Sequence, residues 1–270
     1  MNTNTFTSNM QSNLQRAKDM SDEEKLYRYK GVLYPQLLSP IENLKALENF
    51  KAREEDILLV AYPKCGFNWM VGVVKKIIAE APVEKAEARM PPLMEFFGPE
   101  VVKILVIFRN PKDTLVSFYH FSNKNPYLPS ESWDSFFSNF LSGDVVWGSY
   151  FDHALAWEKR MDDPNVMIVT YEELKQDLSD GIRQISSFFG YSLTEAQVQQ
   201  ISHGSTFSAM KESSAISHGA MLDVIFRKGE VGDWKNHFTP EQSQEMDAAF
   251  NKQLAGTRLG AKLNYQRHCQ

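Results

Sequence analysis

The sequence predicts an α/β fold, a single domain with a central, mostly parallel sheet flanked by helices. Three short runs of Val, Ile and Leu read as strands buried on both faces, because none shows the alternation of a half-exposed strand. A stretch typical of a helix follows each run, and strand–helix alternation indicates a parallel sheet covered by helices. The length of 270 residues suits one such domain, and 43% hydrophobic with 23% charged residues is ordinary for a globular protein.

The expected strands cover residues 57–62, 102–108 and 166–171, and the expected helices cover 69–80, 113–121 and 173–189. Asp113 is a candidate cap for the second helix, and Gly190 is a candidate C-cap for the third. Open α/β sheets bind ligands beyond the carboxyl ends of their strands, so the residues after each run are the place to look for chemistry.

Composition and charge narrow the class of protein. Residues 1–24 are expected to form a mobile polar arm, and 25–270 the folded domain. A net charge of −5 argues against a nucleic-acid partner, although a polyanionic small ligand is possible if cations gather locally. The two cysteines form neither a disulfide framework nor a zinc set. With no signal peptide and no long apolar run, we expect a cytoplasmic protein without a membrane segment.

The first strand ends in a loop that carries Lys64 and Gly66, after which a helix begins. Backbone N–H groups at such a helix start can hold phosphate or sulfate, and a lysine adds charge. An ordinary turn with a solvated lysine is the alternative. A metal-dependent P-loop kinase is disfavoured, because there is no Gly-Lys-Ser/Thr and the second strand ends in Arg109 rather than an aspartate.

Polar residues also follow the later strands. Arg109 and Ser117 would suit a phosphate monoester, although Arg109 could equally pair with a surface carboxylate. Tyr171 ends the third run and could stack on a base or simply pack in the core. Residues 226–236 combine Arg227 and Lys228 with two glycines, which predicts a flexible basic loop that closes on an anion or is only solvated surface.

Together these segments resemble the cytosolic sulfotransferase family, with Cys65 in place of the usual serine pointing to its 6B branch. The motifs are YPKCGFNW at 62–69, IFRNPKDTLVSFYHF at 107–121, TYEELK at 170–175 and RKGEVGDWKN at 227–236. The resemblance covers roughly residues 25–270 and implies a P-loop-like, nucleotide-binding sulfotransferase fold. It implies transfer of a sulfuryl group from 3′-phosphoadenosine 5′-phosphosulfate (PAPS) to a hydroxyl or amine of a small acceptor, without a metal.

The resemblance also implies roles for particular residues. Lys64 would neutralise charge in the transition state, and Arg109 and Ser117 would hold the 3′-phosphate. Trp69, Tyr171 and Phe207 would contact the adenine. The full set of expected PAPS-binding residues is Lys64, Cys65, Gly66, Phe67, Asn68, Trp69, Arg109, Ser117, Tyr171, Ser205, Thr206, Phe207, Ser208, Ala209, Met210, Ile225, Phe226, Arg227, Lys228 and Gly229.

The chain departs from the family pattern between Trp69 and Arg109, where it is shorter and lacks the histidine that acts as general base. The six histidines are His120, His153, His203, His218, His237 and His268. Glu87 and His120 are the two weak candidates for a replacement base. The alternative function is therefore a truncated isoform or pseudoenzyme that binds PAPS with little catalysis. A homodimer is possible, but the family's dimer motif is degenerate here.

Overall fold

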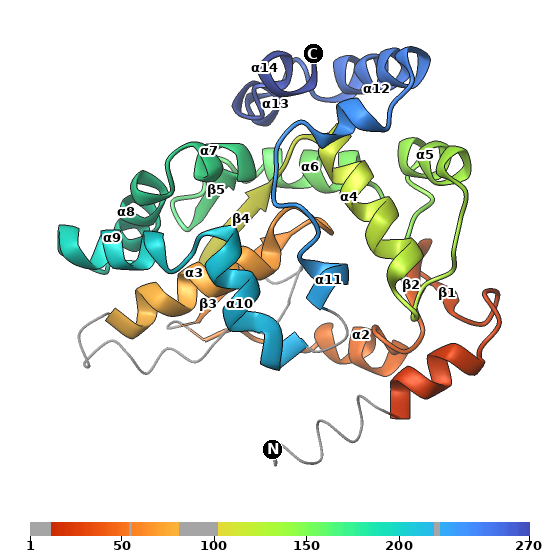
Figure 1. The fold of residues 1–270 in the computed structure, drawn as a ribbon, viewed down its shortest axis with the longest axis horizontal. Coiled ribbons are helices and arrows are strands. Elements are labelled where there is room, and N and C mark those ends of the chain that lie inside the picture. Colours follow the sequence, from red (N-terminus) through yellow and green to blue (C-terminus); the bar gives the residue numbers. More distant parts are fainter. Residues whose placement is uncertain (1–11, 54–55, 81–101, 219–221) are drawn as a thin grey trace.

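Figure 1 shows the computed structural model, which describes residues 12–53, 56–80, 102–218 and 222–270. Three strands form a parallel sheet in the order β3 (Ile57–Ala61), β4 (Lys103–Phe108) and β5 (Val166–Thr170). The register places Leu59 opposite Leu105, and Leu105 opposite Met167. The strands agree with the apolar runs to within one residue, so the predicted single-domain α/β fold is confirmed.

Helices connect and flank these strands, and a short antiparallel hairpin precedes them. The hairpin strands are β1 (Leu26–Tyr29) and β2 (Val32–Pro35). The helices are α2 (Ile41–Leu47), α3 (Phe67–Glu80), α4 (Pro111–Lys124), α5 (Trp133–Ser142), α6 (Tyr150–Glu158), α7 (Tyr171–Gln176), α8 (Leu178–Phe188), α9 (Glu195–His203), α10 (Phe207–His218), α11 (Leu222–Ile225), the 3₁₀ helix η3 (Asp233–Asn236), α12 (Pro240–Gln253), α13 (Arg258–Lys262) and α14 (Tyr265–Cys269).

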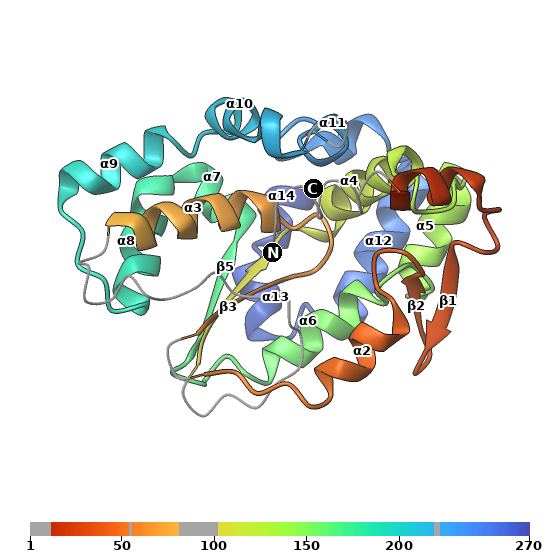
Figure 2. The same cartoon turned by 90° about the horizontal axis from the view of Figure 1, so that it is seen from below.

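The sheet separates two hydrophobic clusters, because successive side chains of a strand point to opposite faces. Leu59 and Ile107 pack with apolar residues of α3, α8 and α9. Val60 and Val106 face the other way, toward α4, α5, α6 and the C-terminal helices. Figure 2 shows α3 and α8 on one side of the strands and α6 with α13 on the other. This burial on both faces explains the continuous apolar runs.

Two details of the helices differ from the sequence prediction. The expected helix over 173–189 is two helices, because Asp177 is extended (φ −146°) and caps α8 by accepting from the Asp180 N–H. Phe189 is the C-cap of α8, and Gly190, which was expected there, follows it with φ 77°, the conformation in which glycine commonly ends a helix. The prediction that Asp113 caps α4 is wrong. Asn110 is the N-cap, and its Oδ1 accepts the Asp113 N–H at 2.8 Å.

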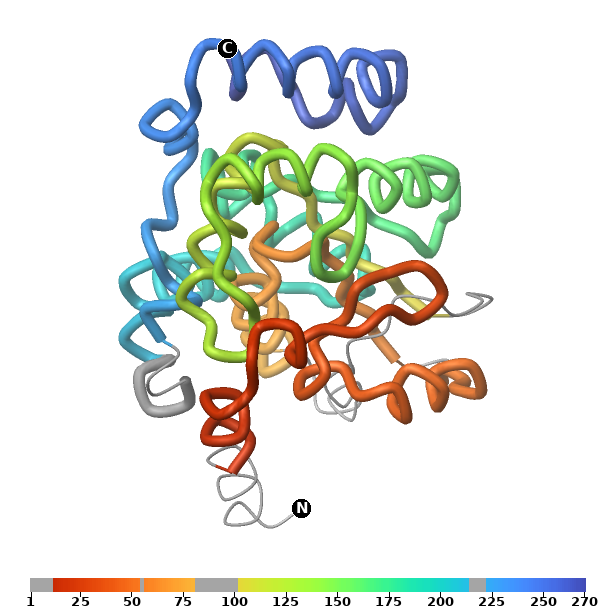
Figure 3. Tube along the Cα trace, turned by 90° about the vertical axis from the view of Figure 1, so that its right-hand side faces the viewer, coloured from red at the N-terminus to blue at the C-terminus, as the bar shows by residue number. Residues whose placement is uncertain are grey.

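Part of the segment that the sequence predicts to be a mobile polar arm is helical. Residues 12–19 form a helix in which Ala17 is fully buried. Leu14 and Ala17 lie three positions apart and so share one face, which gives this otherwise polar segment an apolar contact. Figure 3 shows this helix at the opposite side of the molecule from α12, α13 and α14. In the described ranges, every helix is too short or too polar to cross a membrane.

Candidate functional site

The loop between β3 and α3 has an unusual backbone. Lys64 adopts φ 68°, and Gly66 adopts φ 111°. At Gly66 a side chain would be strained by this angle, and its Cβ would lie 3.0 Å from Ile107 and from the Tyr171 ring. Helix α3 begins directly afterwards, at Phe67, so its first N–H groups have no partner within the helix. This loop therefore presents backbone donors and Lys64 at the carboxyl end of β3, where the sequence predicts an anion site.

Lys64 is buried, and its neighbours compensate its positive charge only in part. Its ammonium donates weakly, at 3.4 Å each, to the carbonyls of Val224 and Ile225 at the end of α11. The same nitrogen lies 4.5 Å from the centroid of the Phe121 ring. Burial, followed by repulsion from Arg109 and Arg227, lowers the pKa of Lys64 to about 7. A bound anion would relieve this repulsion.

Arg109 leaves the end of β4 and is buried. Its Nη2 donates to the Glu230 carbonyl at 2.7 Å, and its guanidinium carbon lies 4.6 Å from the centroid of the Tyr171 ring. Among the described residues, its carboxylate contact is with Asp113, itself buried, at 3.9 Å. Pairing with a surface carboxylate, the alternative that the sequence left open, is therefore not what the structure shows. The Nε of Arg109 is buried and makes no hydrogen bond to the described residues.

Ion pairs with Asp233 hold the basic loop 226–236 in place. Asp233 accepts from Arg227 Nη2 at 2.5 Å and from Lys228 Nζ at 2.6 Å. Although burial opposes it, hydrogen bonds from Lys228, Asn236 and Arg227 hold the pKa of Asp233 well below its usual range. The Nε of Arg227 is buried and, like that of Arg109, has no partner in the described part of the chain.

Aromatic side chains lie beside these cations. The Trp69 and Tyr171 rings meet edge to face, with centroids 5.2 Å apart. Trp69 Nε1 donates to the Ser205 carbonyl at 2.7 Å, which ties α3 to the turn before α10. Ser205 is fully buried, and its hydroxyl has no hydrogen bond to the described residues. Burial raises the pKa of Tyr171 to about 12, so its hydroxyl stays protonated at neutral pH.

Phe207 connects the turn before α10 to the basic loop. Gly229 has φ 70°, and a Cβ there would lie 2.1 Å from the Phe207 ring, so only glycine permits this approach. Phe207 also packs edge to face on Phe226, with centroids 5.9 Å apart. Two segments that the sequence placed in one site therefore meet in the structure.

Four other expected site residues differ from one another in their exposure and in their contacts. The Cys65 side chain turns into the core, 3.6 Å from Thr114 Oγ1, and burial raises its pKa to about 12. Cys65 can therefore contribute its backbone to an anion site, but not a thiolate. Ser117 is buried on α4, and Asn68 is exposed at the start of α3. Met210 is buried and lies against Gly72 of α3.

The two candidates for a general base have different outcomes. Glu87 lies outside the described residues. His120 lies on α4, with its ring centroid 5.0 Å from that of His237, and its buried Nε2 has no partner within the described ranges. Burial and then Arg227 lower the pKa of His120 to about 4. It is a neutral and weak base at pH 7, and it lies toward the basic loop.

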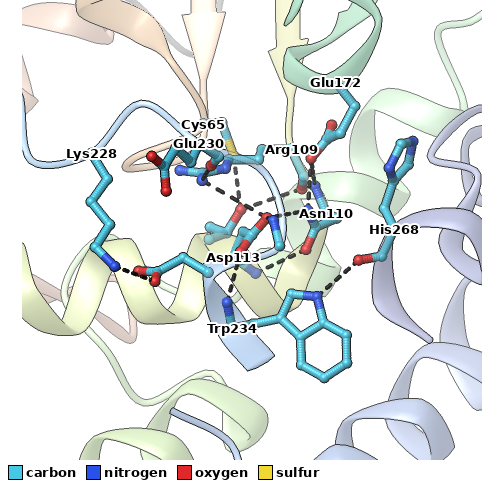
Figure 4. Close-up of polar contacts among 12 residues, drawn as sticks. Cys65, Arg109, Asn110, Asp113, Glu172, Lys228, Glu230, Trp234 and His268 are labelled. Carbon is cyan, nitrogen blue, oxygen red and sulfur yellow. Dashed lines mark hydrogen bonds and ion pairs between the residues drawn. The ribbon is translucent and has the colours of Figure 1, made fainter. Parts of the chain in front are cut away.

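Sequence reasoning missed the acidic residues that organise this site. Asp113 accepts the backbone N–H groups of Gly232 at 2.7 Å and Trp234 at 3.0 Å. Glu172 accepts the side-chain and backbone N–H groups of Asn110, and burial raises its pKa. Figure 4 shows Asp113 between Asn110 and Trp234, with Arg109 and Glu230 beside them. The available signal was an acidic residue inside three of the four quoted motifs, those at 107–121, 170–175 and 227–236.

The arrangement is suited to binding a small polyanion with an aromatic group. It brings together three buried or partly buried cations, two arginine Nε–H donors without a partner among the described residues, and a set of aromatic rings. Within the described ranges, no three His, Cys, Asp or Glu side chains come together in a way that could hold a metal ion.

Comparison with known proteins gives the family. A family model described as "Sulfotransferase domain" matches residues 90–258. Sulfotransferase 6B1 of Danio rerio is 54% identical, over 97% of this chain and all of the relative. That alignment spans 295 positions, more than the 270 residues of this chain, so the relative has residues without counterpart here. Sulfotransferase 6B1 of Homo sapiens is 43% identical over 95% of each chain.

Comparison with solved structures supports the same family. Mouse sulfotransferase SULT7A1 complexed with PAP, the desulfated nucleotide, matches with a TM-score of 0.79 and 35% identity, over 88% of this chain and 98% of that one. A retinol dehydratase complex matches with a TM-score of 0.71 at 19% identity, which supports the fold alone. This chain therefore belongs to the sulfotransferase family and, within it, resembles the 6B branch.

Proposed function

We propose that the protein transfers a sulfuryl group from PAPS to a hydroxyl or amine of a small acceptor. The observation that carries this proposal is the convergence of Lys64, Arg109 and Arg227, which repel one another without a ligand. Two of these cations have a buried Nε–H that makes no hydrogen bond to the described residues. PAPS would supply phosphate and sulfate oxygens to these donors. The relative SULT7A1, solved with PAP, supports the same ligand class.

The proposed roles follow the position of each residue. Lys64 and the first N–H groups of α3 would bind the 5′-phosphosulfate. Trp69, Tyr171 and Phe207 would enclose the adenine. Residues proposed for the 3′-phosphate are Arg109, Ser117, Arg227, Lys228 and Gly229. In this arrangement Arg109 lies between the base and the phosphates, because its guanidinium stacks over Tyr171.

Catalysis would depend mainly on Lys64. The acceptor oxygen attacks sulfur in line, a new S–O bond forms, and the bond from sulfur to the 5′-phosphate oxygen breaks. Negative charge grows on that departing oxygen, and the Lys64 ammonium stabilises it there. The hydroxyl proton passes to a base or to solvent. His120, with its lowered pKa, is a poor acceptor for that proton, so Glu87 stays a candidate and the base is unassigned.

The second candidate is a protein that binds the nucleotide but turns over little. The observation that favours it is the set of residues that the Danio rerio relative has and this chain lacks. A missing general base lowers a rate by about 10²–10⁴-fold, which separates the two candidates clearly.

One pair of measurements decides between them. Calorimetric titration with PAP tests nucleotide binding, and a turnover assay with PAPS and a panel of phenols, alcohols and amines tests transfer. Binding with turnover supports the sulfotransferase, and binding without turnover supports the second candidate. Lys64→Met should weaken PAP binding, because it removes a cation from the anion site, and it should lower turnover by a further factor, because the ammonium also acts on charge that develops in the transition state.

We further propose that the protein acts in the cytoplasm. A homodimer through the segment near Lys235 stays a prediction. In the structure Lys235 donates to the Gln270 carbonyl at 3.0 Å, and Thr239 caps α12 by accepting from the Gln242 N–H. Analytical ultracentrifugation of the full chain tests the dimer.

A further inference from the structure

Two buried carboxylates fix the basic loop 226–236 against the rest of the site. The first is Asp113, in the first turn of α4. Its Oδ2 accepts the Gly232 N–H at 2.7 Å and its Oδ1 accepts the Trp234 N–H at 3.0 Å. Its Oδ2 also accepts from Asn110 Nδ2 at 2.8 Å, which holds the carboxylate in place. The loop backbone is therefore attached to α4, the helix that also carries Ser117.

The second carboxylate is Asp233, which comes from the loop itself. It accepts from Arg227 Nη2 at 2.5 Å, from Lys228 Nζ at 2.6 Å and from Asn236 Nδ2 at 3.0 Å. His237 Nε2 lies 3.5 Å from the same carboxylate. The Asp233 side chain is only 2% exposed, so these contacts leave it little freedom.

The geometry leaves part of Arg227 available. Asp233 occupies one terminal nitrogen of the guanidinium, whereas the Nε–H is buried without a partner among the described residues. A guanidinium held on one side by a carboxylate can present its remaining donors in a fixed direction. Asp113 and Arg109 fix the backbone on the other side, since Arg109 donates to the Glu230 carbonyl.

We propose that Asp113 and Asp233 are positioning residues that hold loop 226–236 in the conformation that binds a 3′-phosphate, and so give the site its preference for 3′-phosphorylated nucleotides. This inference rests on the proposed function, in which PAPS is the sulfuryl donor. The two acidic residues do not touch the nucleotide. They act through Arg227, Lys228 and the backbone of Gly229.

The sign of one measurement separates positioning from a simple effect of charge. If Asp233 acted only through its field, Asp233→Asn would remove a negative charge beside two cations and strengthen anion binding. Positioning predicts the opposite. We expect Asp233→Asn to weaken PAP binding by about 10- to 100-fold, the scale of lost hydrogen bonds to charged groups. Binding of AMP, which lacks the 3′-phosphate, should change less than about threefold.

Calorimetry with PAP and AMP on wild type, Asp233→Asn and Asp113→Asn gives these ratios. Asp144→Asn is the matched control, because Asp144 also pairs with an arginine, Arg28 at 2.6 Å, but its side chain is 50% exposed. Thermal unfolding identifies variants that do not fold. If Asp233→Asn is one of them, Asp233→Glu keeps the charge and moves it by one methylene, and it should lower the preference for PAP over AMP.

The outcomes are distinct. Equal or tighter PAP binding by the folded Asp233 and Asp113 variants overturns the positioning role and leaves the proposed function intact. The same holds if PAP and AMP lose affinity equally. A wild-type protein that does not prefer PAP to AMP overturns the proposed function and the positioning role together.

Discussion

Nucleotide binding should draw a proton onto Lys64. In the ligand-free protein, burial and the nearby Arg109 and Arg227 lower the pKa of Lys64 to about 7. A phosphate or sulfate beside this ammonium favours its charged form and raises the pKa again. The lysine therefore takes up a proton when the nucleotide binds at a pH above about 7.

The size of the effect follows from these values. At pH 8, a group of pKa about 7 is roughly one-tenth protonated. If the bound nucleotide restores the ordinary value of 10.5, nearly every Lys64 carries a proton, so binding takes up about 0.9 proton. The affinity for PAP should then fall almost tenfold for each pH unit between about 8 and 10. The phosphates of PAP contribute little at pH 8, because their second pKa is about 6.

Calorimetry at pH 8 in buffers of different ionisation enthalpy measures this uptake directly. Lys64→Met should abolish it. Lys228→Met is the matched control, because the Lys228 side chain belongs to the same site but is 42% exposed. It should weaken binding and keep the proton uptake. The reasoning is refuted if wild type takes up no proton at pH 8, or if Lys64→Met takes up as much as wild type.

Three other outcomes are expected. Arg109→Ala should weaken PAP binding by about 1.5–3 kcal/mol and AMP binding far less, and calorimetry giving equal losses would contradict its assignment to the 3′-phosphate. Turnover should be fastest with acidic phenols and nearly absent with aliphatic alcohols, because a phenolate needs no general base; a rate series over acceptor pKa checks this. Burial lowers the pKa of His153 from 6.5 to about 4, so stability is full above pH 6.5 and is lost as pH falls toward 4. His120 has a similarly low pKa, so urea unfolding should show a larger loss from pH 7 to 5 than one histidine gives, and His153→Gln should reduce that loss by about 2 kcal/mol.

The strands could be predicted from the sequence because a strand that is buried on both faces consists almost entirely of apolar residues. The runs that became β3, β4 and β5 lack alternation, and each contributes to both hydrophobic clusters. The break at Asp177 escaped prediction, because a short polar residue is tolerated inside a helix and also begins one. Only its contact with the Asp180 N–H shows that it starts α8. Helix 12–19 was missed because a single buried alanine gives almost no periodic signal.

The residues of the candidate site could likewise be predicted from the sequence only in part. Lys64 and Arg109 were predicted because they directly follow strands, and parallel strands bring their carboxyl ends to one edge. The contacts of Asp113 with Gly232 and Trp234 connect residues more than a hundred positions apart, and no local pattern encodes them. The orientation of Cys65 into the core is likewise set by the fold, through its neighbour Thr114.

The net charge of the whole chain does not indicate the local charge at the candidate site. A net charge of −5 gives no sign of a polyanion site. The structure reconciles the two, because the cations come from three separate segments and buried carboxylates lie beside them. Asp233 pairs with Arg227 and Lys228, and Asp113 lies beside Arg109. Without these carboxylates the cations would repel one another with no ligand to compensate. The same acidic residues that lower the net charge therefore let a folded chain keep its cations together before the nucleotide arrives.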